Sequence, residues 1–243
     1  MLPKPLPSAS VNCQHIHISI NPTHYEDAFL AGILHRLRSI CACTLPYHQS
    51  YRRVQKIEAG ETVSWGTENR NLPIRKIKAG HWQIRCADAT ANMYLAVALV
   101  LAAGFLGIEN QETLRWKDKS SKDLSDSMKF SQPPQEALPR SLDQALDILD
   151  ANSYELEHIM ESKVITHYLS LKRHESEVLG ELDDDTLFSV LSQWIQNFRQ
   201  SAGSVRRSFE QARLGLQQYT CTKGNISHAT LDGSKSSIEL FAV

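Results

Sequence analysis

The 243-residue chain is 42% hydrophobic and 22% charged, and its 26 basic and 27 acidic side chains leave a formal net charge of −1 at pH 7. This composition is typical of a globular protein with one large domain or two small ones, and the lack of a basic excess argues against a nucleic-acid partner. The longest apolar stretch, residues 93–108, is shorter than the roughly 18 residues of a membrane span, so we expect no membrane partner either.

Residues 1–14 contain three prolines and lack the apolar core that a signal peptide needs. We expect this N-terminal segment to be poorly ordered. The five cysteines are an odd number and lack the spacing of a disulfide framework. A reducing compartment is the simplest interpretation, and we therefore expect a cytoplasmic protein.

Residues 15–20, HIHISI, alternate polar and apolar side chains, which is the period of a strand. A helix is expected next, because Thr23 is followed three residues later by Glu26, the spacing of a capping box. Apolar side chains then recur along one helical face, before Pro46, at Phe29, Ile33, Leu37 and Ile40.

The middle of the chain has the pattern of β-structure. Strands are predicted at 50–55, 61–66, 73–78 and 81–87, with turns at Gly60, Gly66 and Gly80. Asp88 or Thr90 is expected to cap an apolar helix at 91–106.

The rest of the chain is predicted to be mainly helical. A polar stretch at 109–140 is expected to be a surface loop, and helices are predicted at 141–151, 153–173 and 184–200. The tail from residue 201 onward is expected to be partly disordered. An antiparallel sheet followed by packed helices places the protein in the α+β class.

Two histidines are the first candidates for a site. His15 and His17 lie two residues apart on the first predicted strand, so their side chains point to the same face. Neutral imidazole binds zinc or manganese and can hydrogen-bond to phosphate. On the pattern alone, however, two surface or half-buried histidines are the more common outcome.

Arginines on or beside successive predicted strands are the second candidates, namely Arg53, Arg70, Arg75 and Arg85. If they converge, they form a cluster suited to bidentate contacts with carboxylate or phosphate oxygens. The alternative, which the spacing alone favours, is that each guanidinium is solvated on the outer face of its strand.

Longer motifs add to these patterns. The runs 65-WGTENRNLPIRKI-77 and 81-HWQIRCADATANMYLA-96 strongly resemble the C-terminal catalytic half of glutamine synthetase, and most closely its fungal FluG-type branch. Further pieces occur in the family's order at 15–19, 30–37, 50–54 and 138–149, and in the pattern of Tyr168, Lys172 and Glu175. The resemblance divides the chain into a segment at 1–14, a catalytic domain at 15–200 whose sheet is part of the family's half-barrel, and an extension at 201–243.

The resemblance implies an ATP-dependent carboxylate–amine ligase of the glutamate–ammonia ligase type. It implies ATP and Mg²⁺ or Mn²⁺ as cofactors, a glutamate-like carboxylate and an amine as substrates, and a homo-oligomer. Phosphoryl transfer needs positioning and positive charge around the transferred group, which metals and arginines supply.

The resemblance also implies roles for individual residues. It matches His15 with a metal ligand, and His17 and Ser19 with positions beside ATP. Arg53 and Arg85 match arginines that hold the substrates. Arg70 and Arg75 match arginines that bind ATP and approach the transferring phosphoryl group, and Arg70 is the catalytic one of the two.

The chain departs from the family pattern in its acidic residues. Gln83 stands where the family has a metal-binding glutamate, and an amide brings no negative charge to a divalent ion. No acidic residue precedes Glu26, so the upstream carboxylates of the family's metal site have no counterpart. We therefore expect a truncated C-terminal fragment, a pseudoenzyme that is inactive alone. The alternative is a non-catalytic regulatory or developmental-signalling protein that retains the fold.

Overall fold

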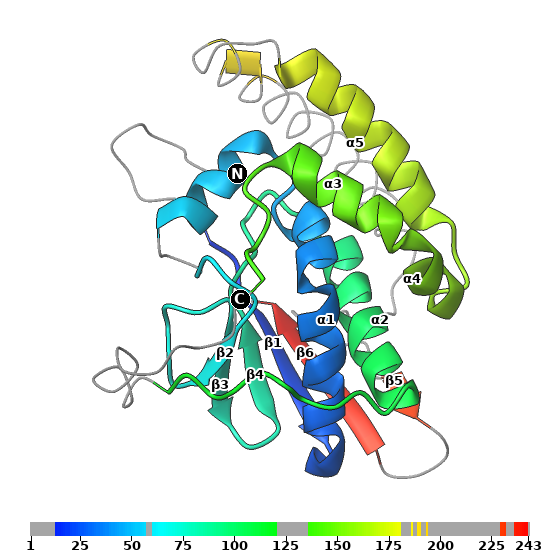
Figure 1. Ribbon diagram of the computed structural model, residues 1–243. Helices are drawn as coiled ribbons and strands as arrows, with labels where there is room; N and C mark the ends of the chain where they lie inside the picture. Colours follow the sequence, from blue (N-terminus) through cyan, green and yellow to red (C-terminus); the bar gives the residue numbers. More distant parts are fainter. Residues whose placement is uncertain are drawn as a thin grey trace, which may run out of the picture.

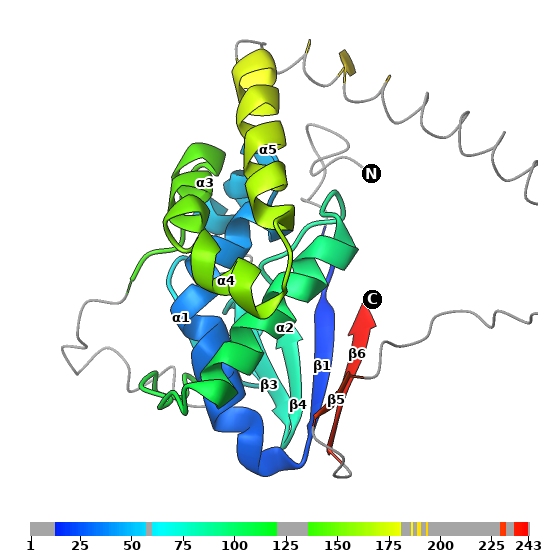
Figure 2. The same cartoon turned by 90° about the vertical axis from the view of Figure 1, so that its right-hand side faces the viewer.

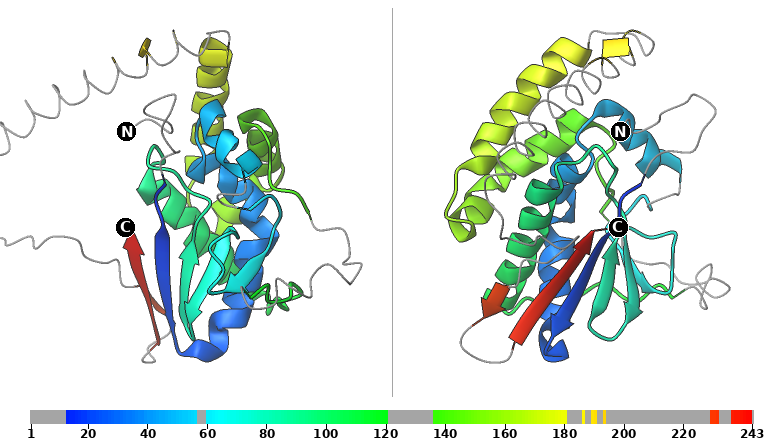
Figure 3. Two further views of the ribbon diagram at one scale, coloured as in Figure 1. Left: turned by 90° about the vertical axis from the view of Figure 1, so that its left-hand side faces the viewer. Right: turned by 180° about the vertical axis from the view of Figure 1, so that it is seen from behind.

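In this computed structural model the described residues are 13–56, 60–120 and 136–180, positions 186, 189, 190 and 193, and two strands near the C-terminus. Helices cover one face of a twisted sheet (Figures 1 and 2). The view from behind shows the opposite face, over which no helix of the described part lies (Figure 3).

The sheet has six strands in the order β2-β3-β4-β1-β6-β5. Their bounds are Ile16–Asn21 (β1), Trp65–Thr67 (β2), Ile74–Lys78 (β3), His81–Ile84 (β4), Ala229–Leu231 (β5) and Ser236–Ala242 (β6). Neighbouring strands are antiparallel except β2 and β3, which are parallel because residues 68–73 return the chain to the end of the sheet where β2 begins. The α+β class is confirmed, with a mixed sheet instead of a purely antiparallel one.

The helical elements of the described part are the 3₁₀ helices Thr23–Tyr25 (η1) and His48–Lys56 (η2) and the α-helices Glu26–Thr44 (α1), Met93–Glu109 (α2), Leu142–Ala151 (α3), Ser153–Ile159 (α4) and Val164–Gly180 (α5). Helices α1 and α2 lie against the sheet (Figure 2). Helix α3 packs on α1, α4 contacts α2, and α5 packs on α3. Within the described ranges, no helix combines the length and the apolar character needed to cross a membrane.

Strand β1 separates the core from the helix-free face of the sheet. Ile16, Ile18 and Ile20 are 0%, 0% and 4% exposed and belong to the hydrophobic core. His17 and Ser19 alternate with them and are partly exposed on the other face. The strand predicted at 15–20 is thus confirmed to within one residue at each end, and its polar face is available for a site.

Helices α1 and α2 meet main chain to main chain. A Cβ atom added to Gly32 would lie 2.2 Å from the carbonyl oxygen of Ala103, and one added to Gly107 would lie 2.2 Å from the carbonyl oxygen of Ala28. No side chain fits at such distances. The two helices therefore reach this separation only because both positions are glycine.

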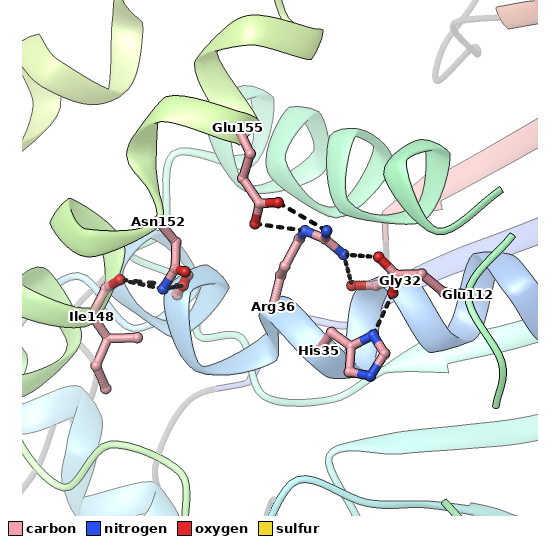
Figure 4. A network of polar contacts seen from close by, with 8 residues as sticks. Gly32, His35, Arg36, Glu112, Ile148, Asn152 and Glu155 are labelled. Atoms are coloured by element: carbon pink, nitrogen blue, oxygen red, sulfur yellow. Dashed lines mark hydrogen bonds and ion pairs between the residues drawn. The ribbon is translucent and has the colours of Figure 1, made fainter. Parts of the chain in front are cut away.

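A buried arginine connects the helices (Figure 4). The Arg36 side chain is 9% exposed and donates to both carboxylate oxygens of Glu155, with Nε–Oε1 and Nη2–Oε2 distances of 2.8 and 2.9 Å. Its Nη1 donates to Glu112 Oε1 at 2.8 Å and to the carbonyl oxygen of Gly32 at 3.3 Å. Glu112 also pairs with His35. One side chain of α1 thereby joins the segment after α2 to α4.

The structure corrects the expected capping of α1. Thr23 lies in η1, and α1 begins at Glu26 with no side-chain hydrogen bond at its N-cap. The Glu26 carboxylate instead accepts hydrogen bonds from the main-chain N–H of Gly80 at 2.7 Å, from Lys76 Nζ at 2.9 Å and from the Trp82 indole at 3.3 Å. Because donors of the β3–β4 hairpin occupy this carboxylate, it joins the hairpin to α1 and does not form a capping box.

The strand predicted at 50–55 is wrong, because these residues belong to η2. Tyr51 and Val54 lie three residues apart and are both 2% exposed in the core, a spacing that fits a 3₁₀ turn and not a strand. The turn predicted at Gly66 is also wrong, because this residue lies inside β2. A Cβ atom there would lie 2.2 Å from the carbonyl oxygen of Lys119, so the glycine permits a close chain contact.

The predicted cap of α2 needs correction as well. Asn92 caps the helix by accepting from the main-chain N–H groups of Tyr94 and Leu95. Asp88 instead accepts from the main-chain N–H of Thr90 at 2.8 Å, within the turn that leads to the helix. A short polar side chain that accepts from the main-chain N–H two residues later forms a local turn, which competes with capping of the helix.

The second half of the chain differs from the prediction in one helix and in the C-terminal tail. The helix predicted at 153–173 is divided into α4 and α5, because Glu157 accepts hydrogen bonds from the main-chain N–H of Thr166 at 2.8 Å and from Lys163 Nζ at 3.0 Å and holds a turn between them. The helix predicted at 184–200 and the segment 1–14 lie almost entirely outside the described residues. Strands β5 and β6 occur in the tail that was expected to be partly disordered, where β6 pairs with the edge of β1.

The arginine network yields a prediction of stability. We expect Arg36→Ala to lower the free energy of unfolding by about 2–3 kcal/mol, because it removes a nearly buried charged donor that hydrogen-bonds to Glu112 and Glu155. Arg173→Ala is the matched control. Arg173 pairs with Asp147 and Asp150 but is 47% exposed, so its loss should cost less than about 1 kcal/mol. Urea unfolding of both variants measures the difference, and equal losses would contradict the prediction.

Candidate functional site

Strand pairing brings the candidate residues onto one face. His17 of β1 lies opposite Gln83 of β4, and Gln83 lies opposite Arg75 of β3. Residues that are directly opposite in a sheet share a face, and residues two apart along a strand share it as well. His15 and Arg85 therefore belong to the same face. We call these five residues, together with Ser19 and His81, the polar face of the sheet.

Gln83 lies at the centre of the polar face. It is 6% exposed, and its amide Nε2 lies 3.1 Å from His15 Nδ1 and 3.1 Å from His17 Nε2. Its Oε1 accepts a hydrogen bond from Arg85 Nη1 at 3.2 Å and a longer one from Arg75 Nη1 at 3.5 Å. The histidines and two of the predicted arginines thus meet at a single neutral amide.

A second set of contacts extends from His17 along the sheet. His17 Nδ1 lies 3.2 Å from His81 Nε2, and Ser19 Oγ lies 2.8 Å from His81 Nδ1. His81 was absent from the sequence-based site, although the alternation of 81-HWQIR-85 places it on the face of Gln83 and Arg85. The same period that identified His15 and His17 would have found it.

The two histidines in contact are held in the neutral form. Burial lowers the pKa of His17, and the charges of His81 and Arg75 lower it further. Burial also lowers the pKa of His81, with a smaller effect from Lys78. Both imidazoles are therefore mainly neutral near pH 7.

The predicted arginines differ in their placement. Arg75 forms an ion pair with Glu68, and Arg85 Nε donates to the main-chain carbonyl of Arg70 at 3.0 Å. The side chain of Arg70 is exposed, so its main chain is what supports the polar face. Arg53 lies in η2, and its side chain is outside the described residues.

The residues of the polar face do not fit a divalent cation. The histidine nitrogens that face Gln83 are 3.1 Å from an amide nitrogen, and the amide oxygen is 3.2 and 3.5 Å from two guanidinium groups. Within the described residues, no three His, Cys, Asp or Glu side chains are grouped so that they could hold a metal ion. Hard divalent ions prefer anionic oxygen ligands, whereas guanidinium groups repel them.

The fold and these motifs define a class of protein. The chain belongs to the glutamine synthetase family, because the family model of the glutamine synthetase catalytic domain matches residues 1–186. Among its relatives, the protein fluG of Emericella nidulans is 39% identical over 188 residues, which cover 76% of this chain and 22% of fluG. The glutamine synthetase of Methanocaldococcus jannaschii is 30% identical over 196 residues, covering 72% of this chain and 43% of that protein.

Solved structures agree with this assignment. Ligand-free GmaS has a TM-score of 0.63 at 26% identity, covering 75% of this chain and 45% of GmaS. A crystal structure described as a novel glutamine synthase homolog has a TM-score of 0.62 at 28% identity, covering 79% of this chain and 47% of the homolog. The chain thus spans less than half the length of each of these relatives. The predicted family and its fold are confirmed, while the roles of individual residues remain predictions.

The environment of His81 yields the second prediction. We expect Lys78→Met to raise the pKa of His81 toward the usual histidine value of about 6.5, because the variant removes a neighbouring positive charge. Titration of the His81 ring by NMR measures the shift. Lys163→Met, a change on the far helical layer, should leave the His81 pKa unchanged. A pKa that falls or stays constant in Lys78→Met would contradict this explanation.

Proposed function

We propose that this domain provides the phosphate- and carboxylate-binding face of an ATP-dependent carboxylate–amine ligase of the glutamate–ammonia ligase type. The observation that supports it best is the convergence of Arg75 and Arg85 on Gln83, beside the histidine pair. In this proposal His17 and Ser19 lie beside the nucleotide, and Arg53 and Arg85 hold the carboxylate substrate. Arg70 and Arg75 act on the transferring phosphoryl group.

The chemistry of phosphoryl transfer supports this assignment. The transferred group carries negative charge on its equatorial oxygens, and guanidinium groups stabilise that charge through fixed donors. Arg75 lies in β3 and Arg85 directly follows β4, and rigid elements position such donors better than loops do. A relative solved as a GmaS/ADP complex, with a TM-score of 0.62 at 25% identity, also supports a nucleotide at this fold.

We further infer that the 243-residue chain does not perform the ligation unaided. ATP and a carboxylate substrate together bring several negative charges to the polar face, and arginines offset only part of them. The family generally uses divalent metals for the remainder, whereas the residues around Gln83 do not fit a metal. A cytoplasmic location and assembly with further copies belong to the same proposal.

A second candidate function is a non-catalytic regulatory protein that binds a nucleotide or a carboxylate. Gln83 is the observation that favours it, because a neutral amide occupies the centre of the polar face. The two candidates differ in turnover and not in binding, so binding and catalysis need separate measurements.

Nucleotide binding is the third prediction. We expect the chain to bind ATP weakly, with an affinity that changes little when Mg²⁺ is chelated, because arginines and not a metal contact the phosphates. Arg75→Met should weaken binding by about tenfold or more, as expected for the loss of a charged hydrogen-bond donor. Isothermal titration calorimetry measures both effects, with Arg173→Met as the control. Tight binding that collapses on chelation would contradict the prediction.

Catalysis is the fourth prediction. We expect no measurable glutamine formation by the purified chain, in either the biosynthetic or the γ-glutamyl-transfer assay. The loss of one charge-stabilising group commonly costs about a hundredfold in rate. Gln83→Glu alone should not restore activity, because the described polar face would then offer only one carboxylate to a divalent ion. Turnover by the wild-type chain that is abolished by His15→Ala would overturn the inference that the chain does not perform the ligation unaided.

A further inference from the structure

We propose that Gln83 determines the ligand of the polar face, so that this face binds a phosphate-type oxyanion directly through hydrogen-bond donors, without a metal ion, and Ser19 presents its hydroxyl as one of these donors. The inference rests on the proposed function and deepens it, because it names the chemistry by which the phosphate is held. It follows from the direction of the hydrogen bonds around Gln83.

The arginines fix the orientation of the Gln83 amide. A guanidinium group has only donors, so an atom that lies 3.2 Å from Arg85 Nη1 and 3.5 Å from Arg75 Nη1 must be an acceptor. That atom is the amide oxygen. The opposite orientation would place the NH₂ group against two other donors. The NH₂ group therefore faces His15 and His17.

The amide in turn fixes the tautomers of both histidines. Its NH₂ group donates to His15 Nδ1 and to His17 Nε2, each at 3.1 Å, so both ring nitrogens must carry a lone pair. The proton of His15 is then on Nε2, and that of His17 is on Nδ1. The lone pairs that could bind a metal from this side are occupied by hydrogen bonds.

The donor-to-acceptor direction of these hydrogen bonds continues from His17 through His81 to Ser19. Because the proton of His17 is on Nδ1, this atom donates to His81 Nε2 at 3.2 Å. His81 then carries its own proton on Nδ1 and donates to Ser19 Oγ at 2.8 Å. The serine oxygen accepts this bond, so its hydroxyl hydrogen is directed to a different partner. The series of hydrogen bonds that begins at the two guanidinium groups thus ends at the Ser19 hydroxyl, which is free to act as a donor.

The direction of these hydrogen bonds determines which kind of ligand the polar face can bind. A hydroxyl donor and two guanidinium groups on one face suit a ligand with several acceptor oxygens, which is the chemistry of phosphate. In the described part of the chain, Arg75 Nε is a further buried donor with no hydrogen-bond partner. With a carboxylate at position 83 the histidine nitrogens would lose their donor, and their lone pairs would become available to a cation.

The tautomers can be tested on the wild-type chain. Long-range ¹H–¹⁵N NMR at about pH 8, where histidine is neutral, should show the proton on Nδ1 in His17 and His81 and on Nε2 in His15. A proton on Nε2 of His17 would overturn the inference. This measurement needs no variant and is independent of any effect of mutation on folding.

Ligand choice is tested with Mn²⁺ alone and with inorganic tripolyphosphate in the presence of a chelator, both by calorimetry. We expect the wild-type chain to bind tripolyphosphate, and Ser19→Ala to weaken this binding by about three- to tenfold, with Ser176→Ala as the control. Gln83→Glu should weaken tripolyphosphate binding and raise Mn²⁺ affinity by at least about tenfold. Gln83→Glu combined with His15→Ala should remove that gain.

The outcomes separate this inference from the proposed function. Equal Mn²⁺ affinity in the wild-type chain and in Gln83→Glu would overturn the inference, but it would not contradict the proposed function if the chain binds ATP. The expected tautomers and tripolyphosphate binding, together with no affinity for ATP, would support the inference and contradict the proposed ligase function.

Discussion

The contact between α1 and α2 at Gly32 and Gly107 determines where the rest of the structure can lie. Strand β1 leads through η1 into α1, and β4 leads through residues 85–92 into α2, so the two central strands end in the two helices that touch. The isoleucines of β1 fill the space beneath these helices. His17 and Gln83 are consequently directed to the opposite face, in register with each other.

Electrostatics differ between the two faces of the sheet. On the helical side, the donors of Arg36 face the carboxylates of Glu112 and Glu155. On the polar face, Arg75 has Glu68, whereas Gln83 is neutral where it meets both arginines. A guanidinium whose donors face carboxylates joins the elements that carry them, while a face with an excess of donors suits the anionic ligand proposed above. Arginine thus connects helices on one side of the sheet, and on the other side it contacts a neutral amide at the proposed site.

The sequence predicted the parts of the fold that have a regular period, such as β1 and the apolar stripe of α1. The family motifs, together with the strand period, also predicted that His15, His17, Arg75 and Arg85 lie on one face, although the spacing alone favoured separately solvated arginines. Sequence reasoning failed where a tertiary partner changed a local preference. Glu26 has the spacing of a cap, yet donors 50 or more residues away bind it. Tyr51 and Val54 fit a strand composition, yet the core selects a 3₁₀ turn.

The glycine contact also restricts how this sequence can change. In most cores a larger side chain at one position can be compensated by a smaller one at its neighbour. At Gly32 and Gly107 the neighbour is a carbonyl oxygen of the main chain, which no substitution can shorten. A side chain gained at either position therefore has no compensating partner, and only a shift of a whole helix could accommodate it. Such a shift would move β1 and β4 as well. Substitution of either helical glycine would therefore alter the hydrogen bonds around Gln83.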